Sequence, residues 1–224
     1  MPDKVFVATL VANLLFLASG AMELGFSIAA MNIKDKAPTD GQDATRHLIY
    51  QQFPLTAGIV NAVFVLATFV FTIPAMALVK RNLLKISGYM ITVCGVFTLA
   101  VGLYLWIMTL RLKETFEPIY AAQDSSIQSL FQTSFQCCGY LNSTSPAFVT
   151  DSVCPSPAAA TLLRGCSTSM SSFANAFIND LFTAVFGMVG IDALLVLAIA
   201  CLLKERKEKE RYYIIDQKRD YGRL

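Results

Sequence analysis

The stretch Gln136-Cys137-Cys138-Gly139-Tyr140 places two adjacent cysteines in the longest polar segment of an otherwise apolar chain. Two more cysteines, Cys154 and Cys166, follow in the same segment. Because a bond between neighbouring cysteines would strain the peptide that joins them, each member of the pair is expected to bond a different partner. Two pairings stay open: Cys137–Cys166 with Cys138–Cys154, or the crossed alternative. Either pairing ties one short segment of the chain twice.

The composition is that of an integral membrane protein. Of the 224 residues, 55% are hydrophobic and 15% are charged, and the mean hydropathy is +0.54. A soluble domain carries about a quarter charged residues, so this chain lies well outside that class. The single His and single Trp leave few of the side chains that catalysis or metal binding uses. We therefore expect no catalytic residue, no metal site and no nucleic-acid partner.

Four apolar segments are long enough to cross a bilayer, which takes about 20 residues. They are residues 5–28, 54–79, 86–108 and 181–203. The first apolar run continues through Leu24, Phe26 and Ile28, so we expect it to be retained as a span and not cleaved as a signal peptide.

The charges of the connecting segments predict the orientation. Residues 80–85 hold Lys80, Arg81 and Lys85 and no acid, and residues 204–224 hold eight basic and five acidic residues, or +3. Residues 109–180 hold three basic and five acidic residues, or −2. Basic segments stay in the cytosol, which places both termini and the 80–85 loop there. Residues 29–53 and 109–180 then form a small and a large extracellular loop, where disulfides persist.

The large loop is expected to contain helices on either side of an irregular centre. Apolar residues recur at helical spacing over residues 111–136 and again over residues 169–180. Between them, residues 140–165 are rich in Ser, Thr, Pro and Ala, which is typical of loops. The predicted fold is therefore all-α and membrane-integral: a four-helix transmembrane bundle with a small disulfide-bonded helical extracellular domain.

Four spans, a short first loop and a long second loop with Cys137-Cys138-Gly139 together resemble the tetraspanin family, over nearly the whole chain. Arg164-Gly165-Cys166 is similar to the Glu-Gly-Cys of that family, with Arg in place of Glu. Asn13 matches the polar Asn of its first span. The resemblance implies the pairing Cys137–Cys166 with Cys138–Cys154.

The chain departs from the animal members of the family in three respects. The third span lacks the usual buried Glu or Gln, the large loop has four cysteines instead of six or more, and residues 80–85 have no cysteine for acylation. In its size and in these absences the chain is most similar to the fungal tetraspanins associated with host penetration by infection cells.

Two polar residues lie within the expected spans. Asp192 is near the middle of the fourth span, where an ionisable group is costly and often functional. It is about as deep as Asn13, at ~1.5 Å per helical residue from the cytosolic end. We expect a hydrogen bond from the Asn13 amide to Asp192 that clamps two helices. The alternative is that Asp192 lines a cavity for a lipid or sterol, which is the one cofactor that we consider.

The large loop carries candidate modification and recognition sites. Asn142-Ser143-Thr144 is an N-glycosylation sequon, so Asn142 is expected to carry a glycan. Pro146-Ala147-Phe148-Val149 is an apolar cluster, which makes Phe148 and Val149 candidates for partner binding. The alternative for Phe148 is that it fills the small core over the disulfides.

Two further candidates lie near the cytosolic end of the fourth span. Cys201 comes just before Lys204, a common position for palmitoylation, whereas Cys94 lies deeper in the third span and is expected to serve packing. Tyr212 and Ile215 match a tyrosine-based sorting signal, which implies trafficking through endosomes or the vacuole as well as residence in the plasma membrane.

The resemblance implies a non-enzymatic scaffold that laterally binds and organises other membrane proteins, including other tetraspanins, and supports polarised growth or host penetration in a fungus. A thiol oxidoreductase is disfavoured because its cysteines would be spaced Cys-x-x-Cys. A four-span adhesion or junction protein is the main alternative, but such proteins carry the long cysteine-bearing loop first. A lipid-binding or channel-like protein is a weaker alternative, because it rests on Asp192 alone.

Overall fold

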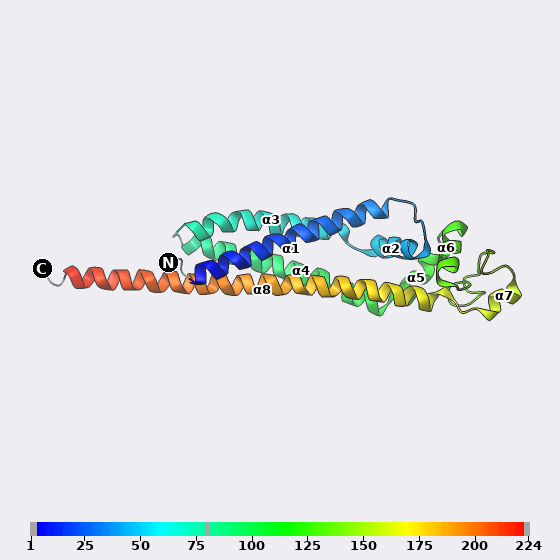
Figure 1. Ribbon diagram of the computed structural model, residues 1–224. Coiled ribbons are helices and arrows are strands. Elements are labelled where there is room, and N and C mark those ends of the chain that lie inside the picture. The colour runs from blue at the N-terminus through cyan, green and yellow to red at the C-terminus, as the bar shows by residue number, and fades with distance from the viewer. Residues whose placement is uncertain (1–3, 79–80, 222–224) are drawn as a thin grey trace. The chain divides into compact units, whose positions relative to one another are not determined.

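The computed structural model describes residues 4–78 and 81–221, and this part of the chain is all-helical (Figure 1). Three short segments lie outside the described residues: 1–3, 79–80 and 222–224. They belong to the expected N-terminal segment, the second span, the loop of residues 80–85 (the tight loop) and the C-terminal tail. The helices are α1 (Lys4–Lys34), α2 (Gly41–Gln52), α3 (Leu55–Ala77), α4 (Arg81–Leu110), α5 (Leu112–Ala121), α6 (Ser125–Phe135), α7 (Pro157–Leu162) and α8 (Cys166–Tyr221).

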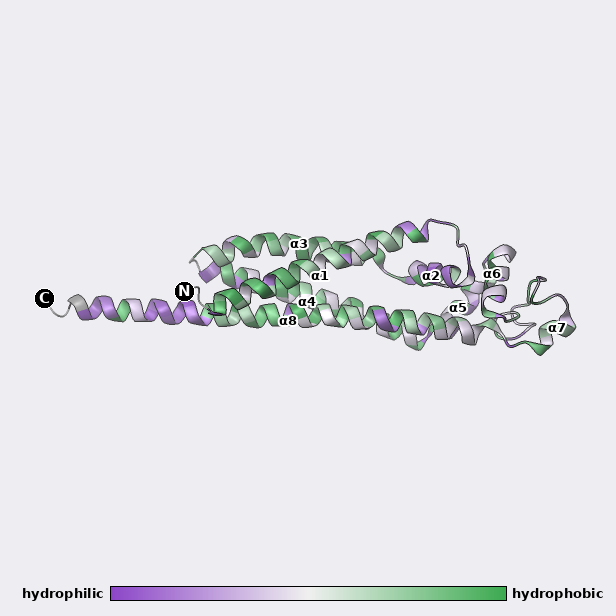
Figure 2. Cartoon of the chain, in the orientation of Figure 1, coloured by the Kyte–Doolittle hydropathy of each residue, from purple (hydrophilic) through white to green (hydrophobic). Residues whose placement is uncertain are grey.

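Four of these helices, α1, α3, α4 and α8, are long and apolar enough to cross a membrane, which identifies an integral membrane protein. Their apolar stretches and the hydrophilic last part of α8 are visible in Figure 2. Each expected span lies within one of these helices or coincides with it to within a few residues. Three of the helices run well past the expected boundaries, because polar residues continue a helix outside the apolar segment.

Several expected loops are helical. Residues 81–85, assigned to the tight loop, form the first turn of α4. The small loop contains α2, which begins after Asp40, whose carboxylate accepts a hydrogen bond from the Asp43 amide at 2.7 Å. Both helices expected in the large loop are present, the first divided into α5 and α6 around residues 122–124. The loop at residues 140–165 is irregular, as expected, except for α7.

The chain divides into two compact units. The membrane unit consists of Met1–Phe26, Thr56–Val101 and Val185–Leu224, and the disulfide unit of Ser27–Leu55 and Gly102–Ala184. In the membrane unit α1, α3, α4 and α8 pack around one apolar core (Figure 1). Phe16, Val65, Ile91 and Leu195, one from each helix, are among its buried residues.

Arg206 joins the polar part of α8 to the end of α3. Its guanidinium group donates hydrogen bonds to the carbonyl oxygens of Leu78 at 2.7 Å, of Ala75 at 3.4 Å and of Met76. The last carbonyls of a helix have no partner within it and carry partial negative charge, so a guanidinium group is well suited to them. This contact fixes one face of α8 beyond its apolar stretch.

The disulfide unit combines the small and the large loop. Helix α2 packs on α6, and the Gly41 amide donates to the Ser134 hydroxyl at 2.8 Å. Tyr50 of α2 contacts Phe177 of α8 edge to face, with the ring centroids 5.9 Å apart. Leu48 and Ile49 are fully buried. The small loop is thus part of the core of this unit, which its polar composition did not predict.

Candidate functional site

The disulfide unit contains two disulfides, Cys137–Cys166 and Cys138–Cys154. Their Cα–Cα distances are 5.0 and 5.9 Å, within the usual range for such bonds. All four cysteines are fully buried. Of the two pairings that spacing left open, this is the one that the tetraspanin resemblance implies.

Backbone hydrogen bonds hold the Cys-Cys-Gly segment against the start of α8. The Cys138 amide donates to the Arg164 carbonyl at 3.1 Å, and the Cys166 amide donates to the Gly139 carbonyl at 2.9 Å. The Ser167 amide donates to the Tyr140 carbonyl at 2.9 Å. The two segments are therefore fixed to each other by backbone pairing as well as by the Cys137–Cys166 bond.

Two glycines permit this pairing. Gly139 has φ +69°, and a Cβ added there would lie 2.1 Å from the Asn142 carbonyl oxygen. A Cβ on Gly165 would lie 2.2 Å from the Leu141 carbonyl oxygen. No side chain fits at either distance, so both the Gly of Cys-Cys-Gly and the Gly of Gly165-Cys166 are required by close backbone approach.

Gln132 and Asp151 organise the polar centre of the unit. The Gln132 side chain is fully buried, donates to the Val149 carbonyl and to Asp151 Oδ2, each at 2.7 Å, and accepts from the Val149 amide at 3.0 Å. Asp151 Oδ1 accepts from the amides of Val153 and Cys154 at 2.8 and 2.7 Å. These bonds satisfy the backbone of an irregular segment that has no strand or helix to do so. Sequence reasoning missed both residues.

Two buried tyrosines pack together beside this centre. The rings of Tyr120 and Tyr140 lie 5.2 Å apart, and the Tyr140 hydroxyl donates to the Lys113 carbonyl at 2.8 Å. The Tyr120 hydroxyl has no partner among the described residues. Burial and the charge of Asp151 raise the pKa of Tyr120 to about 12, and burial and the charge of Glu117 raise the pKa of Tyr140. Because the unfolded phenols ionise near ~10, stability is fully present below that pH and is lost as the pH rises from about 10 to 12.

The apolar residues of the loop are divided between core and surface. Phe148 is half-buried against Cys138, Cys154 and Ala160, which favours its core role over docking. Val149 is also half-buried. Leu162, at the end of α7, is 87% exposed, more than any other large apolar side chain of the described residues. Leu162 follows the Ala-rich run of residues 158–160, and no local pattern in the sequence predicted its exposure.

The proposed glycosylation site is accessible. Asn142 is exposed, and its side-chain oxygen accepts hydrogen bonds from the Thr144 amide at 2.9 Å and the Thr144 hydroxyl at 2.8 Å. These contacts order the sequon as a turn.

In the membrane unit the expected bond between Asn13 and Asp192 is absent. The Asn13 side-chain oxygen instead accepts from the Thr72 hydroxyl of α3 at 2.9 Å. Both Asn13 and Asp192 are buried. The expectation was wrong because equal depth in a membrane does not place two residues on facing sides of their helices.

Asp192 belongs to a polar cluster to which each of the four long helices contributes one residue. The Asn61 amide of α3 donates to both carboxylate oxygens of Glu23 on α1, at 3.0 Å each, and to the Thr98 hydroxyl of α4 at 2.9 Å. Asp192 of α8 lies close enough for electrostatic interaction with both Glu23 and Thr98. Glu23, Asn61 and Thr98 were missed, although a Glu within an apolar run is a readable signal.

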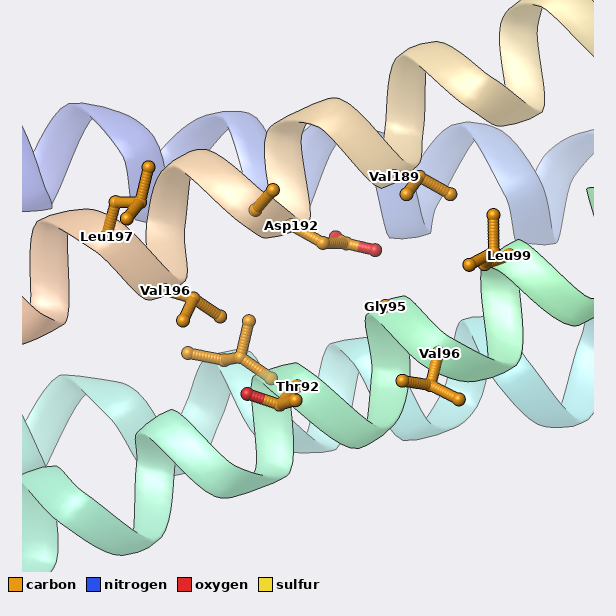
Figure 3. Close-up of a pocket in the computed structure, with 10 residues that line it drawn as sticks. Thr92, Gly95, Val96, Leu99, Val189, Asp192, Val196 and Leu197 are labelled. Atoms are coloured by element: carbon orange, nitrogen blue, oxygen red, sulfur yellow. The ribbon is translucent and has the colours of Figure 1, made fainter.

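A cleft of about 420 Å³ opens beside this cluster, between α4 and α8. It is lined mainly by apolar residues that include Ile91, Leu99 and Val196, together with Asp192 and with Thr92, whose hydroxyl donates to the Gly88 carbonyl at 2.9 Å. Figure 3 shows the Asp192 carboxylate pointing from α8 toward α4. Its Oδ2 atom is buried and has no hydrogen-bond partner among the described residues. The cleft therefore offers one unpartnered carboxylate oxygen in a mostly apolar lining.

The remaining candidates are placed as follows. Cys94 is buried, and the Thr68 hydroxyl lies 3.5 Å from its sulfur, whereas Cys201 is exposed and free. Tyr212 and Ile215 are exposed on the polar part of α8, three residues apart on one helical face. In the residues that the structure describes, no three His, Cys, Asp or Glu side chains gather as a metal site would require.

No protein-family model, no curated protein and no solved structure matches the chain. The likeness to tetraspanins therefore rests on the residues themselves and on their order along the chain.

Replacing Gly165 by alanine should prevent the native disulfides from forming, since the added methyl group would collide with backbone oxygens that cannot move independently. We expect free thiols to become available to alkylation, as measured by mass spectrometry of the non-reduced protein. Gly187→Ala is the matched control, because a Cβ at Gly187 meets nothing within 4 Å. Full disulfide formation in Gly165→Ala would contradict the role given to close backbone approach.

Phenylalanine substitutions at the two buried tyrosines should differ in effect. Tyr140→Phe removes the hydrogen bond to the Lys113 carbonyl and should cost about 1–2 kcal/mol, whereas Tyr120→Phe removes a hydroxyl without a partner and should be neutral or stabilising. Hydrogen exchange of the amides in α5 reports the difference. Equal protection in the two variants would show that the hydrogen bond does not stabilise this unit.

Proposed function

We propose that the protein is a non-enzymatic scaffold of the tetraspanin type, which binds partner membrane proteins laterally and organises them in a patch of membrane. The four long helices would form a transmembrane bundle with both termini in the cytosol. Two observations support this orientation. The tight loop and the tail are basic, which favours the cytosol, and the two disulfides require an oxidising compartment for the large loop.

The observation that carries this proposal is the exposed apolar end of α7. Leu162 is the last residue of α7, a helix of only six residues, and Leu163 follows it. Both disulfides tie the segment that holds these two leucines. The Leu162 side chain is 87% exposed, and contact of this apolar surface with water is unfavourable in free energy. A partner protein that covered Leu162 would remove this contact with water. The disulfides reduce the conformational entropy that binding would otherwise cost.

Other features fit a protein that works at the cell surface. A glycan on Asn142 would shield one side of the disulfide unit from partners. Palmitoylation of Cys201 would add an anchor at the cytosolic end of α8, and Tyr212 with Ile215 would direct retrieval from the plasma membrane. By its likeness to the fungal tetraspanins, we assign it a role in polarised growth or host penetration, with other tetraspanins among its partners.

Proximity labelling tests the scaffold role. The variant Leu162→Ser/Leu163→Ser should lose its principal labelled partners about tenfold or more, because the exposed leucines would form the centre of the contact. Thr150→Ala, an exposed change in the same unit, is the control. Surface expression and intact disulfides are verified in each variant.

A replacement of residues 140–165 by the corresponding loop of an unrelated four-span protein extends this test. Loss of the same partners as in the double-serine variant supports recognition by the disulfide unit. If both variants kept the same set of labelled partners, α7 would not be the recognition site, and partner binding would have to be assigned to the membrane helices.

A second candidate function, binding of a lipid or sterol, is favoured by one specific observation. The cleft between α4 and α8 is mostly apolar and contains the unpartnered Asp192 oxygen, to which a sterol hydroxyl or a lipid polar group would donate. Such binding is compatible with the scaffold role, because the ligand would fill a gap between two of the four helices.

Photo-crosslinking with a sterol analogue tests this second candidate. Asp192→Leu removes the acceptor, and Val196→Trp fills the cleft while retaining Asp192, so both should reduce labelling several-fold if the ligand lies there. Leu194→Trp, on the exposed face of α8, is the control. Equal labelling of the wild type and both cleft variants would exclude this site.

A further inference from the structure

A second hollow, of about 360 Å³, lies between the beginning of α4 and the polar continuation of α8. Its lining differs from that of the Asp192 cleft, because it is mostly basic. The residues are Arg81, Asn82 and Lys85 from α4, with Leu203, Lys204 and Lys207 from α8. Four cations from two helices therefore face one concave space of a size that suits a small ligand.

The spacing of these cations follows from helix geometry. Arg81 and Lys85 are four residues apart on α4, and Lys204 and Lys207 are three apart on α8, so each pair shares one helix face. Arg206, between the two lysines of α8, is held by α3 carbonyls and keeps that part of α8 in place.

Most of this positive charge is not neutralised by the protein. Lys85, Lys204 and Lys207 form no ion pair with any described carboxylate, and Glu205 is directed to Lys209 at 2.8 Å. Arg81 pairs with Glu210 at 3.1 Å, but both side chains are exposed and such a pair contributes little. An anion would thus meet three lysines without partners and an arginine that is easily released.

The hollow lies at the level where apolar surface gives way to polar surface. Leu203 lines it, and Ile86, next to Lys85, is an exposed apolar residue. Beyond Lys204 the hydropathy of α8 changes from apolar to polar (Figure 2). A bilayer has its phosphate groups at this level, and its cytosolic leaflet is rich in anionic lipids.

We propose that this hollow binds a phosphomonoester, supplied either by the headgroup of a phosphorylated inositol lipid or by a free inositol phosphate. The four basic side chains give the charge that a phosphomonoester of about −2 needs, and Asn82 gives an amide donor. The bound group would join α4 to the tail of α8. The inference rests on the proposed function only for the side of the membrane, which must be cytosolic for inositol lipids to reach the hollow.

Fluorescence anisotropy with the purified full chain in neutral detergent tests the proposal. The probes are labelled short-chain phosphatidylinositol 4-phosphate, labelled short-chain phosphatidylserine, and unlabelled inositol 1,4-bisphosphate as competitor. Lys204→Gln/Lys207→Gln removes two cations of the hollow. Arg211→Gln/Lys218→Gln removes two cations elsewhere on α8 and is the matched control, while Lys85→Gln tests the contribution of α4.

We expect the wild type to prefer the phosphorylated inositol lipid to phosphatidylserine, and the double change at Lys204 and Lys207 to weaken that binding about tenfold to thirtyfold. Lys85→Gln should weaken it about fivefold, and the control pair less than twofold. Competition by inositol bisphosphate at concentrations similar to those of the lipid identifies the free phosphate as sufficient, and weak competition identifies the lipid as the source.

Equal affinity for the two lipids, or equal losses in the hollow and control variants, would overturn the proposal and leave only diffuse charge attraction. The measurement contains no partner protein. The Leu162→Ser/Leu163→Ser variant should therefore bind the lipid normally, which keeps this result distinct from the fate of the scaffold proposal.

Discussion

The hydrocarbon core of a bilayer supplies no hydrogen bonds, and the membrane unit is organised by that constraint. Each of the four long helices satisfies its own backbone, and its polar side chains must find partners on other helices. Asn61 does so by bonding Glu23 and Thr98 on two neighbouring helices, and Thr72 by bonding Asn13. The same constraint makes the unpartnered Asp192 oxygen conspicuous, because no solvent satisfies it in the bilayer interior.

The disulfide unit meets a different difficulty, which is the irregular segment between α6 and α8. Outside the short α7 this segment has no regular secondary structure to satisfy its backbone, so covalent and polar contacts supply much of its order. Two disulfides, the backbone pairing across Gly139 and Gly165, and the bonds of Gln132 and Asp151 together fix an irregular segment. In this arrangement α7 buries Ala160 in the cluster with Cys138 and Cys154, and Leu162 at its end is left exposed.

The three proposed binding surfaces differ in polarity and charge, and each therefore suits a different kind of ligand. The end of α7 is apolar and suits a protein partner, whereas the hollow beside Lys204 is basic and suits a phosphate group. The Asp192 cleft is mostly apolar with one unpartnered carboxylate oxygen, which suits a lipid or sterol. A scaffold that gathers proteins in a patch of membrane would use contacts with both proteins and lipids.

The sequence by itself determined the apolar spans, the helices of the large loop and the candidate cysteines, because hydrophobic length, period and composition are local properties. Only the tertiary structure decided which residues meet. Asn13 and Asp192 have similar depths yet different partners, since helix rotation is set by packing of all four helices. Three other features also depend on contacts between segments far apart in the chain. They are the burial of α2, the hydrogen bonds of Gln132 and the basic hollow. A local sequence pattern carries no information on the distance between residues of different helices, because packing of the whole chain determines that distance.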